Sequence, residues 1–370
     1  MAAALRFLAL TFPILGIALL VTWLPRGSGG YPGLSDETEF EAKIMQQQPN
    51  EEERALQERI AEIGDGFAGE VGIAVIDVQT GRAFLHNGDE KFPQQSVSKL
   101  WVAMTALDQA DRGKLELDEP VIMRREDLTV FYQPIRNIVR ARGSFSADYA
   151  ELMRRALASS DNSANDRILR RVGGPEEVEE FLEREEIGGV EFGTDERSKQ
   201  SAIAGLTWRQ AYSYRDEFYK ARDRVPEDVR RKAFEAYLAD PVDGATPRGI
   251  AEALARLARG ELLSSVSSAL LLAILEQTKS GPRRLKGAAP GDWRIAHKTG
   301  TGQFFDGEQS GYNDVGLLTA PDGRQYAVAV MIRRTRASYA ARMEMMQEVT
   351  RAVVEYDEML SASPSPDEPL

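Results

Sequence analysis

The apolar positions divide the chain into a helical middle and strand-like segments towards both ends. Residues 71–77 and 83–86 are short apolar runs separated by Gln79-Thr80-Gly81, which predicts two strands joined by a tight turn. Towards the other end the same pattern returns, and it predicts strands over residues 293–298, 314–319 and 325–332.

Between these strands, from about Ser96 to Gln277, the apolar residues recur mostly with the period of an α-helix. The stretch at about 208–238 has the same period and is dense in Arg, Glu and aromatic residues. Further helices are predicted over residues 51–63, 99–108, 147–158, 175–185, 246–259 and 340–356.

Strands at both ends of a helical middle predict an α+β fold. We expect the terminal strands to pair in one sheet and residues 96–280 to form a second, helical lobe. The predicted domain spans residues 51–358. It follows a flexible linker at 26–50, which is rich in Gly, Pro, Gln and acidic residues, and it precedes a disordered tail at 359–370.

Residues 7–24 form an apolar stretch of 18 positions without a charge. This length lies between the core of a signal peptide and a full membrane span. No Ala-x-Ala cleavage pattern follows, so residues 1–25 favour an uncleaved anchor in the inner membrane over a cleaved signal peptide. Both interpretations predict export to a periplasmic or other extracytoplasmic location.

The composition narrows the chemistry that the chain can carry out. A net charge of -12 over 370 residues, without a long Lys/Arg run, argues against a nucleic-acid partner. There is no cysteine, and the two histidines are His86 and His297, so a thiolate or a His-rich metal site is not expected. A general base is therefore sought among lysines and carboxylates, and no cofactor is predicted.

Three short motifs occur in a fixed order along the chain: Ser96-Val97-Ser98-Lys99, Ser160-Asp161-Asn162 and Lys298-Thr299-Gly300. Residues three apart on a helix share a face, so the amine of the first motif can reach its hydroxyl. A serine becomes a nucleophile when a base takes its proton, and burial or a second nearby cation lowers the pKa of a lysine enough for that role. We expect the lysine of the third motif to be that second cation.

The other two motifs have structural as well as chemical interpretations. Ser160-Asp161-Asn162 combines the residue types preferred at a helix N-cap with a second hydroxyl beside an amide. Lys298-Thr299-Gly300-Thr301 follows a strand, and its small residues allow a substrate backbone to lie against that strand. Lys279-Ser280-Gly281 has a similar sequence, but it follows an apolar helical run and is interpreted as a helix end closed by glycine.

This series of motifs resembles that of the class A serine β-lactamases and the related penicillin-binding D,D-peptidases. The resemblance covers roughly residues 55–356. It implies an antiparallel sheet with helices on both faces, with the active site between the sheet and the helical lobe.

The resemblance also implies a role for each residue of the motifs. Ser96 would attack the substrate carbonyl, with Lys99 or a carboxylate acting through water as base, and Ser160 would pass a proton to the leaving nitrogen. Asn162 would bind the substrate's amide side chain. The substrate carboxylate would lie against Lys298, Thr299 and Gly300, and the main-chain N–H groups of Ser96 and Thr301 would bind the oxyanion.

Release of the acyl group needs a further base, and the resemblance implies a glutamate with an amide one turn later. Glu196, followed by Gln200, is the first candidate. The surrounding residues differ from the usual loop, and an apparent insertion at about 201–239 follows. Glu227 and Glu235, which lie in that insertion, are therefore rival candidates.

Two further positions follow from the resemblance. Phe131 or Tyr132 would supply the aromatic wall that is common in the family, although core packing explains these residues equally well. No arginine partner for the substrate carboxylate is identified after Lys298. His297 takes the place of an acidic residue before that lysine, so we expect His297→Asp to change the pH–rate profile.

The sequence therefore predicts an exported serine hydrolase that opens β-lactam antibiotics through an acyl-enzyme on Ser96. The alternatives are a D,D-peptidase that acts on peptidoglycan-like stem peptides and a membrane-tethered penicillin sensor. All three interpretations share the acylation residues, take small-molecule or peptide substrates and differ in the fate of the acyl-enzyme. The pattern gives no indication of the oligomeric state.

Overall fold

The computed structural model describes residues 48–362. The predictions for residues 1–25, for most of the 26–50 linker and for residues 363–370 fall on parts of the chain outside that range. Within residues 48–362, no helix has both the length and the apolar character needed to cross a bilayer.

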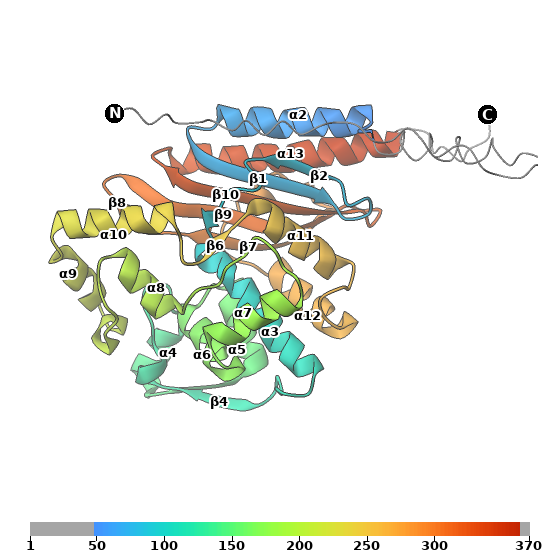
Figure 1. Ribbon diagram of the computed structural model, residues 1–370. Helices are drawn as coiled ribbons and strands as arrows, with labels where there is room; N and C mark the ends of the chain where they lie inside the picture. The colour runs from blue at the N-terminus through green and yellow to red at the C-terminus, as the bar shows by residue number, and fades with distance from the viewer. Residues whose placement is uncertain (1–47, 363–370) are drawn as a thin grey trace, which may run out of the picture. The chain divides into compact units, whose positions relative to one another are not determined.

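A six-stranded antiparallel sheet is built from both ends of the described chain (Figure 1). The strand order is β2-β1-β10-β9-β7, with β8 paired to β9. Because β1 pairs with β10, placing Ala74 opposite Ala329, the predicted pairing of the terminal strands is confirmed. The strands are β1 (Gly69–Asp77), β2 (Ala83–His86), β7 (Arg294–Thr301), β8 (Phe304–Phe305), β9 (Glu308–Thr319) and β10 (Gln325–Thr335).

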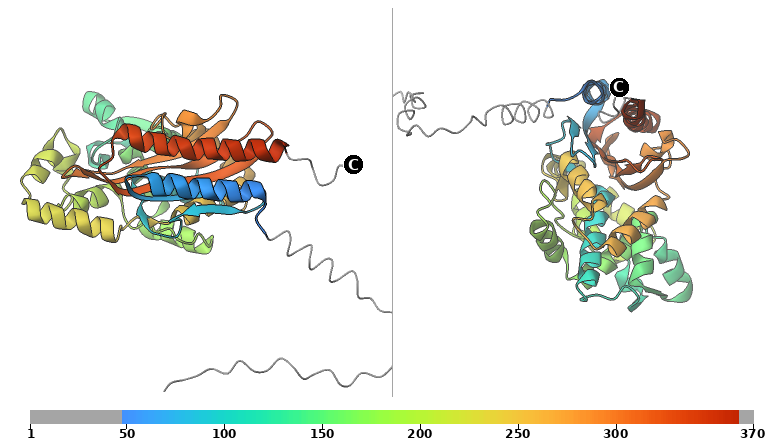
Figure 2. Two further views of the ribbon diagram at one scale, coloured as in Figure 1. Left: turned by 90° about the horizontal axis from the view of Figure 1, so that it is seen from above. Right: turned by 90° about the vertical axis from the view of Figure 1, so that its right-hand side faces the viewer.

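Two long helices, α2 (Glu51–Gly66) and α13 (Tyr339–Ala362), lie side by side over one face of the sheet (Figure 2). Leu56 of α2 and Val353 of α13 belong to the apolar cluster that joins these helices to the strands. The prediction of a tail from residue 359 is wrong over residues 359–362, because α13 continues to Ala362 and Leu360 packs against the same cluster.

The opposite face of the sheet is covered by α11 and the helical lobe (Figure 1). This confirms the α+β class with helices on both faces of an antiparallel sheet. The lobe also contains two small sheets, formed by β4 with β5 and by β3 with β6. Its elements are β3 (Phe92–Pro93), α3 (Lys99–Asp111), β4 (Pro120–Met123), α4 (Ile135–Arg142), β5 (Phe145–Asp148), α5 (Tyr149–Ala158), α6 (Asn162–Val172), α7 (Pro175–Arg184), β6 (Gly244–Ala245), α11 (Pro247–Ala258) and α12 (Ser265–Glu276).

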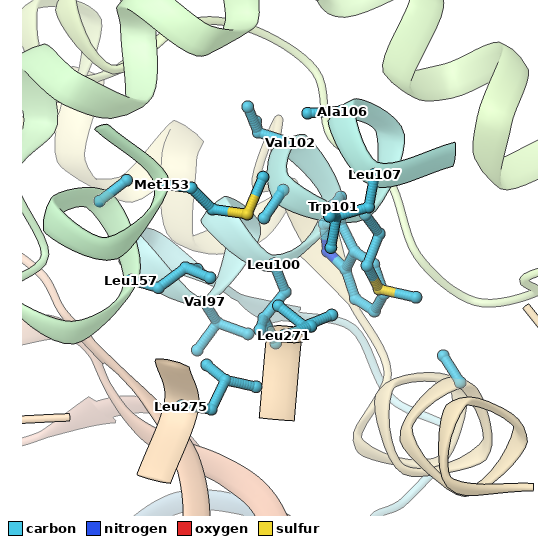
Figure 3. Packing of buried hydrophobic residues seen from close by; sticks show 14 of the residues in the cluster. Val97, Leu100, Trp101, Val102, Ala106, Leu107, Met153, Leu157, Leu271 and Leu275 are labelled. Atoms are coloured by element: carbon cyan, nitrogen blue, oxygen red, sulfur yellow. The ribbon is translucent and has the colours of Figure 1, made fainter. Parts of the chain in front are cut away.

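Helix α3 is the centre of this lobe and is surrounded by α5, α6, α7 and α12. All residues from Lys99 to Gln109 are buried, so this part of the helix has no face exposed to solvent. The close view in Figure 3 shows Trp101 and Leu100 of α3 among side chains from α5 and α12. The helix that carries Lys99 is therefore held in place mainly by apolar packing against its neighbours.

The stretch at 208–238 is not one continuous helix. It contains a 3₁₀ turn and two separate helices, α9 (Glu217–Asp223) and α10 (Glu227–Ala239), which follow α8 (Glu196–Ile203). Arg215 has a positive φ of 51°, and Pro226 stands immediately before α10, where its ring cannot continue the preceding helix. The helical period was therefore correct for α9 and α10 and wrong for residues 208–216, which form a 3₁₀ turn and loops.

We expect Trp101→Ala to lower the free energy of unfolding by about 3–5 kcal/mol, because the indole is fully buried and its removal leaves a cavity. The change also removes the hydrogen bond that Trp101 Nε1 donates to Gln94 Oε1 (2.6 Å). Denaturant unfolding measures the effect. Val266→Ala, at a position that is 77% exposed, is the control, and equal stabilities of the two variants would contradict this packing role.

Candidate active site

The serine of the first motif lies in a 3₁₀ turn, Gln95–Ser98, immediately before α3. Gln95 holds this turn in place with an unusual positive φ of 55°. Its N–H donates to Asp243 Oδ2 (2.8 Å), and its side-chain amide donates to Tyr237 Oη and the Ser310 carbonyl. Ser96 thus precedes the α-helix instead of lying within it, and Lys99 is the first residue of α3.

The Lys99 ammonium lies at the centre of the first two motifs. Its Nζ donates to Ser96 Oγ at 2.8 Å, to Asn162 Oδ1 at 2.5 Å and to Ser160 Oγ at 3.3 Å. The side chain is completely buried. Burial lowers the pKa of Lys99, and the nearby Glu196 carboxylate opposes this shift only in part. A proton on Ser96 therefore has an amine acceptor within hydrogen-bond distance.

The second motif forms the junction between α5 and α6. Ser160 has a positive φ of 56°, and Asp161 caps α6 by accepting the N–H groups of Ser163 and Ala164. The other Asp161 oxygen accepts the N–H of Ile135. The motif is therefore a helix cap that also turns a hydroxyl and an amide towards Lys99, as both of its interpretations required.

The third motif lies on β7, where Lys298 Nζ donates to Ser160 Oγ at 3.0 Å. Burial and the nearby Lys99 ammonium lower the pKa of Lys298 well below its ordinary value. Gly300 is required because a Cβ there would lie 2.3 Å from the carbonyl oxygen of Gln94. The strand therefore packs directly against the turn that holds the serine.

The interpretation of Lys279-Ser280-Gly281 as only a closed helix end is wrong. Helix α12 ends at Glu276, four positions before Ser280, and the Ser280 hydroxyl lies 2.6 Å from Thr299 Oγ1. Ser280 and Lys279 line the same cavity as Ser96. The sequence pattern could not show that this segment folds back onto β7.

Arg284 is a site residue that the sequence did not reveal. Its guanidinium donates to Thr301 Oγ1 at 2.7 Å and to the carbonyls of Gly300 and Asn313. It also lies 3.7 Å above the ring centroid of Tyr312. An arginine partner was expected after Lys298, whereas Arg284 precedes that lysine and reaches β7 from the segment after α12.

Glu196 is the first residue of α8, and its side chain is almost completely buried. Its carboxylate lies 3.9 Å from Lys99 Nζ and 3.4 Å from Lys199 Nζ, and it accepts a hydrogen bond from Gln200 Nε2 at 3.3 Å. Burial favours the neutral acid, but the two ammonium groups outweigh it and hold the pKa of Glu196 at about 2. An ionised carboxylate therefore faces the Ser96–Lys99 pair at neutral pH.

The two rival glutamates do not lie at this site. The Glu227 side chain is 77% exposed and pairs with Arg231, whereas that of Glu235 is 48% exposed and pairs with Arg334. Neither residue lines the cavity that contains Ser96. Both are exposed residues of α10, so neither carboxylate is in a position to activate a water at Ser96.

A buried ion-pair network connects Glu196 to the turn that holds Ser96. Lys199 Nζ donates to Asp243 Oδ2 at 3.0 Å, and Tyr237 Oη donates to Asp243 Oδ1 at 2.8 Å. Gln200 Nε2 also donates to Gln95 Oε1 at 2.9 Å. The sequence pattern did not indicate that Lys199 pairs with Asp243.

A cavity of about 570 Å³ opens over these groups. Phe131 lines it, has a positive φ of 58° and packs edge-on against Phe218 of α9. Phe131 thus both lines the cavity and packs against the insertion. His297, in contrast, pairs with Asp314 and does not line the cavity. In the part of the chain that the structure describes, no group of three or more His, Cys, Asp or Glu side chains could hold a metal ion. The lining includes Ser96, Ser160, Asn162, Glu196, Thr299 and Thr301.

Comparison with known proteins agrees with this geometry. The sequence model of the beta-lactamase enzyme family matches residues 55–356. The extended-spectrum beta-lactamase PER-1 of Pseudomonas aeruginosa is 29% identical over 303 residues, which cover 82% of this chain and 87% of that protein. Beta-lactamase SME-1 of Serratia marcescens is 27% identical over 248 residues, or 67% of this chain and 71% of that protein.

Solved structures give the same result. A beta-lactamase from Chitinophaga pinensis is 27% identical with a TM-score of 0.67, over 82% of this chain and 99% of that chain. A class A beta-lactamase representing the last common ancestor of Gram-negative bacteria is 30% identical with a TM-score of 0.64, over 81% of this chain and 98% of that chain.

The chain therefore belongs to the beta-lactamase enzyme family, within the class A serine β-lactamases. It is a hydrolase that opens β-lactam rings. The comparisons do not favour the D,D-peptidase and sensor alternatives, because the relatives are named as β-lactamases.

Asp166 is a second buried carboxylate next to Glu196. Its Oδ1 accepts the N–H of Glu196 at 3.2 Å, and its Oδ2 lies 3.6 Å from Arg197 Nε. Burial, together with the negative charges of Asp195 and Glu196, raises the pKa of Asp166 from 3.8 to about 7. Because the folded-state pKa is the higher one, stability contributed by Asp166 is present at low pH and is lost as the pH rises from about 4 to 7.

We therefore expect Asp166→Asn to stabilise the protein more at pH 8 than at pH 5, with a difference of roughly 2 kcal/mol. The amide retains the acceptor for the Glu196 N–H and removes the buried charge. Thermal or denaturant unfolding at the two pH values measures the effect, with the exposed Asp118→Asn as control. A gain that is independent of pH would show that Asp166 does not titrate in this range.

Proposed function

We propose that Ser96 is the nucleophile of this β-lactamase and that Lys99 accepts its proton. The observation that carries the proposal is the 2.8 Å hydrogen bond between Ser96 Oγ and a fully buried Lys99 Nζ. An amine in this environment is more readily neutral than one in water, and only the neutral amine can accept a proton. Glu196, acting through a water, is the alternative acceptor.

Acylation then forms the Ser96 Oγ–carbonyl bond and breaks the C–N bond of the lactam ring. Ser160 gives its proton to the ring nitrogen, and its position between Lys99 and Lys298 supports this role because either ammonium can replace that proton. The main-chain N–H groups of Ser96 and Thr301 would bind the developing oxyanion.

Four polar side chains fit the rest of the substrate. Lys298, Thr299 and Thr301 bind the carboxylate on the lactam's fused ring, and Arg284 holds the Thr301 hydroxyl in place from behind. Gly300 allows the strand to approach the catalytic turn. Asn162, which donates to the Val130 carbonyl, binds the amide of the substrate's side chain.

Glu196 acts as the base for deacylation. A water between Glu196 and Ser96 gives a proton to the carboxylate and attacks the ester carbonyl. The Ser96 Oγ–carbonyl bond then breaks, and Ser96 recovers the proton that Glu196 took from the water. A pKa of about 2 keeps Glu196 ionised across the neutral range, and its hydrogen bond from Gln200 supports its orientation. This role distinguishes rapid turnover from one-time acylation.

We expect Glu196→Gln to accumulate a covalent penicillin adduct on Ser96 and to lower kcat by at least about 100-fold, because the substitution removes the deacylation base and leaves Ser96, Lys99 and Ser160 in place. Intact-mass measurements after mixing with benzylpenicillin follow the adduct. Glu227→Gln and Glu235→Gln are matched controls that should turn over normally. Unchanged turnover in Glu196→Gln would remove this glutamate from the mechanism.

Residues 51–358 are the catalytic domain in this proposal, and residues 1–25 direct export, with an uncleaved membrane anchor favoured over a cleaved signal peptide. The charge-free apolar stretch at 7–24 supports it. Cell fractionation with N-terminal sequencing tests this: full-length protein in the membrane fraction is expected. Soluble protein without residues 1–25 would instead indicate cleavage, and retention in the cytoplasm would contradict export.

A further inference from the structure

Helix α9 of the insertion supplies two side chains to the active-site cavity, Tyr219 and Arg222. Neither takes part in the acylation or deacylation steps proposed above. Gln303, between β7 and β8, and Phe304 of β8 line the same cavity. The insertion therefore forms a wall of the substrate site that the catalytic steps leave unused.

An aromatic cluster holds α9 in this position. Phe218 is buried and packs edge-on against Phe131 with ring centroids 4.9 Å apart, and Tyr212 approaches it from the preceding turn at 5.9 Å. Tyr219 lies 6.0 Å from Phe131. Because Phe131 follows directly from the buried Val130, which packs in the same cluster, α9 is anchored to the helical lobe.

The Arg222 guanidinium has little to neutralise its charge. It lies 5.1 Å from the ring centroid of Tyr219, and its hydrogen bonds to Asp223 Oδ1 are 3.4 Å long. The Arg222 side chain is only 23% exposed, whereas that of Asp223 is 63% exposed. An ion pair with such an exposed carboxylate contributes little free energy. A half-buried cation is thus available to an anion in the cavity.

The chemistry of a β-lactam predicts which part of the substrate reaches this wall. The ring carboxylate and the acylamino side chain project from opposite ends of the bicyclic core, with the lactam carbonyl between them. When the carbonyl lies at Ser96 and the carboxylate at Thr299, the side chain extends past Asn162 towards Gln200. Gln303 bonds to Gln200 through its amide (3.0 Å) and adjoins Arg222 in a second small pocket.

We propose that Arg222 is a specificity residue that binds an anionic group on the acylamino side chain of the β-lactam. The group would be a carboxylate, which the planar guanidinium can bind through two hydrogen bonds while Tyr219 supports the opposite face. This inference rests on the proposed placement of the substrate carbonyl at Ser96 and of its ring carboxylate at Thr299.

Two penicillins that differ by a single carboxylate test the proposal. Carbenicillin is benzylpenicillin with an added carboxylate on the side-chain carbon, so the ratio of their kcat/KM values isolates the contribution of that charge. We expect Arg222→Gln to lower the carbenicillin-to-benzylpenicillin ratio at least tenfold, mainly by raising KM for carbenicillin. A tenfold change corresponds to the loss of about one charge-assisted hydrogen bond. Arg222→Lys should restore part of the ratio.

The control is Arg224→Gln. Arg224 lies two positions after Arg222, and its exposed side chain does not line the cavity, so this variant removes the same charge without touching the proposed site. An equal change of the ratio in both variants would mean that the effect comes from the overall positive charge of α9 and not from Arg222 itself. A fall of both substrates by the same factor in Arg222→Gln would assign the residue to packing. Either outcome overturns the proposal.

Binding to Ser96→Ala separates this inference from the catalytic proposal. The dissociation constants of the two penicillins, measured by calorimetry with and without Arg222→Gln, report the subsite without any chemistry. A tenfold or greater loss confined to carbenicillin supports the anion site even if Ser96 is not the nucleophile. Equal losses, or none, overturn it even if Ser96 is acylated as proposed.

Discussion

The arrangement of the whole site depends on one buried ammonium, that of Lys99, which lies among Ser96, Ser160 and Asn162 and out of contact with solvent. Burial of a charge costs free energy, so this group must be held in place by rigidly packed secondary-structure elements. Helix α3, which starts at Lys99, is buried along most of its length, and β7 approaches the catalytic turn closely enough to exclude any side chain at Gly300. Apolar packing thus maintains the electrostatic environment that makes the serine reactive.

Basic and acidic side chains alternate in the buried network that starts at Lys99. Glu196 lies between Lys99 and Lys199, and Lys199 in turn pairs with Asp243, which also fixes the backbone of Gln95. The same carboxylate that is proposed to activate water is therefore part of the network that holds the nucleophile's turn. The insertion contributes to this network through Tyr237 of α10 and to the substrate wall through α9, so it is continuous with the site.

The sequence predicted the features that local patterns encode. Short apolar runs identified the strands, and because they lay towards both ends of the chain, the pairing of β1 with β10 could be predicted. The three motifs were identifiable because each combines residue types at a fixed short spacing. Contacts between distant segments were not predictable: Arg284 reaches Thr301, Ser280 reaches Thr299 and Lys199 reaches Asp243 only because of how the loops fold back. The prediction of a disordered tail from residue 359 was wrong for a similar reason, since the burial of Leu360 depends on tertiary packing.

The charge state of Lys99 is the most direct test of this account. With lysine labelled with carbon-13 at Cε, the chemical shift of each side chain can be followed by NMR as the pH is raised, and the signal missing from Lys99→Met identifies the residue. We expect Lys99 to lose its proton at a lower pH than the exposed lysines, because burial penalises its charged form. Titration together with the exposed lysines, or above them, would contradict it, since Lys99 would then be fully protonated at neutral pH and unable to accept the proton of Ser96.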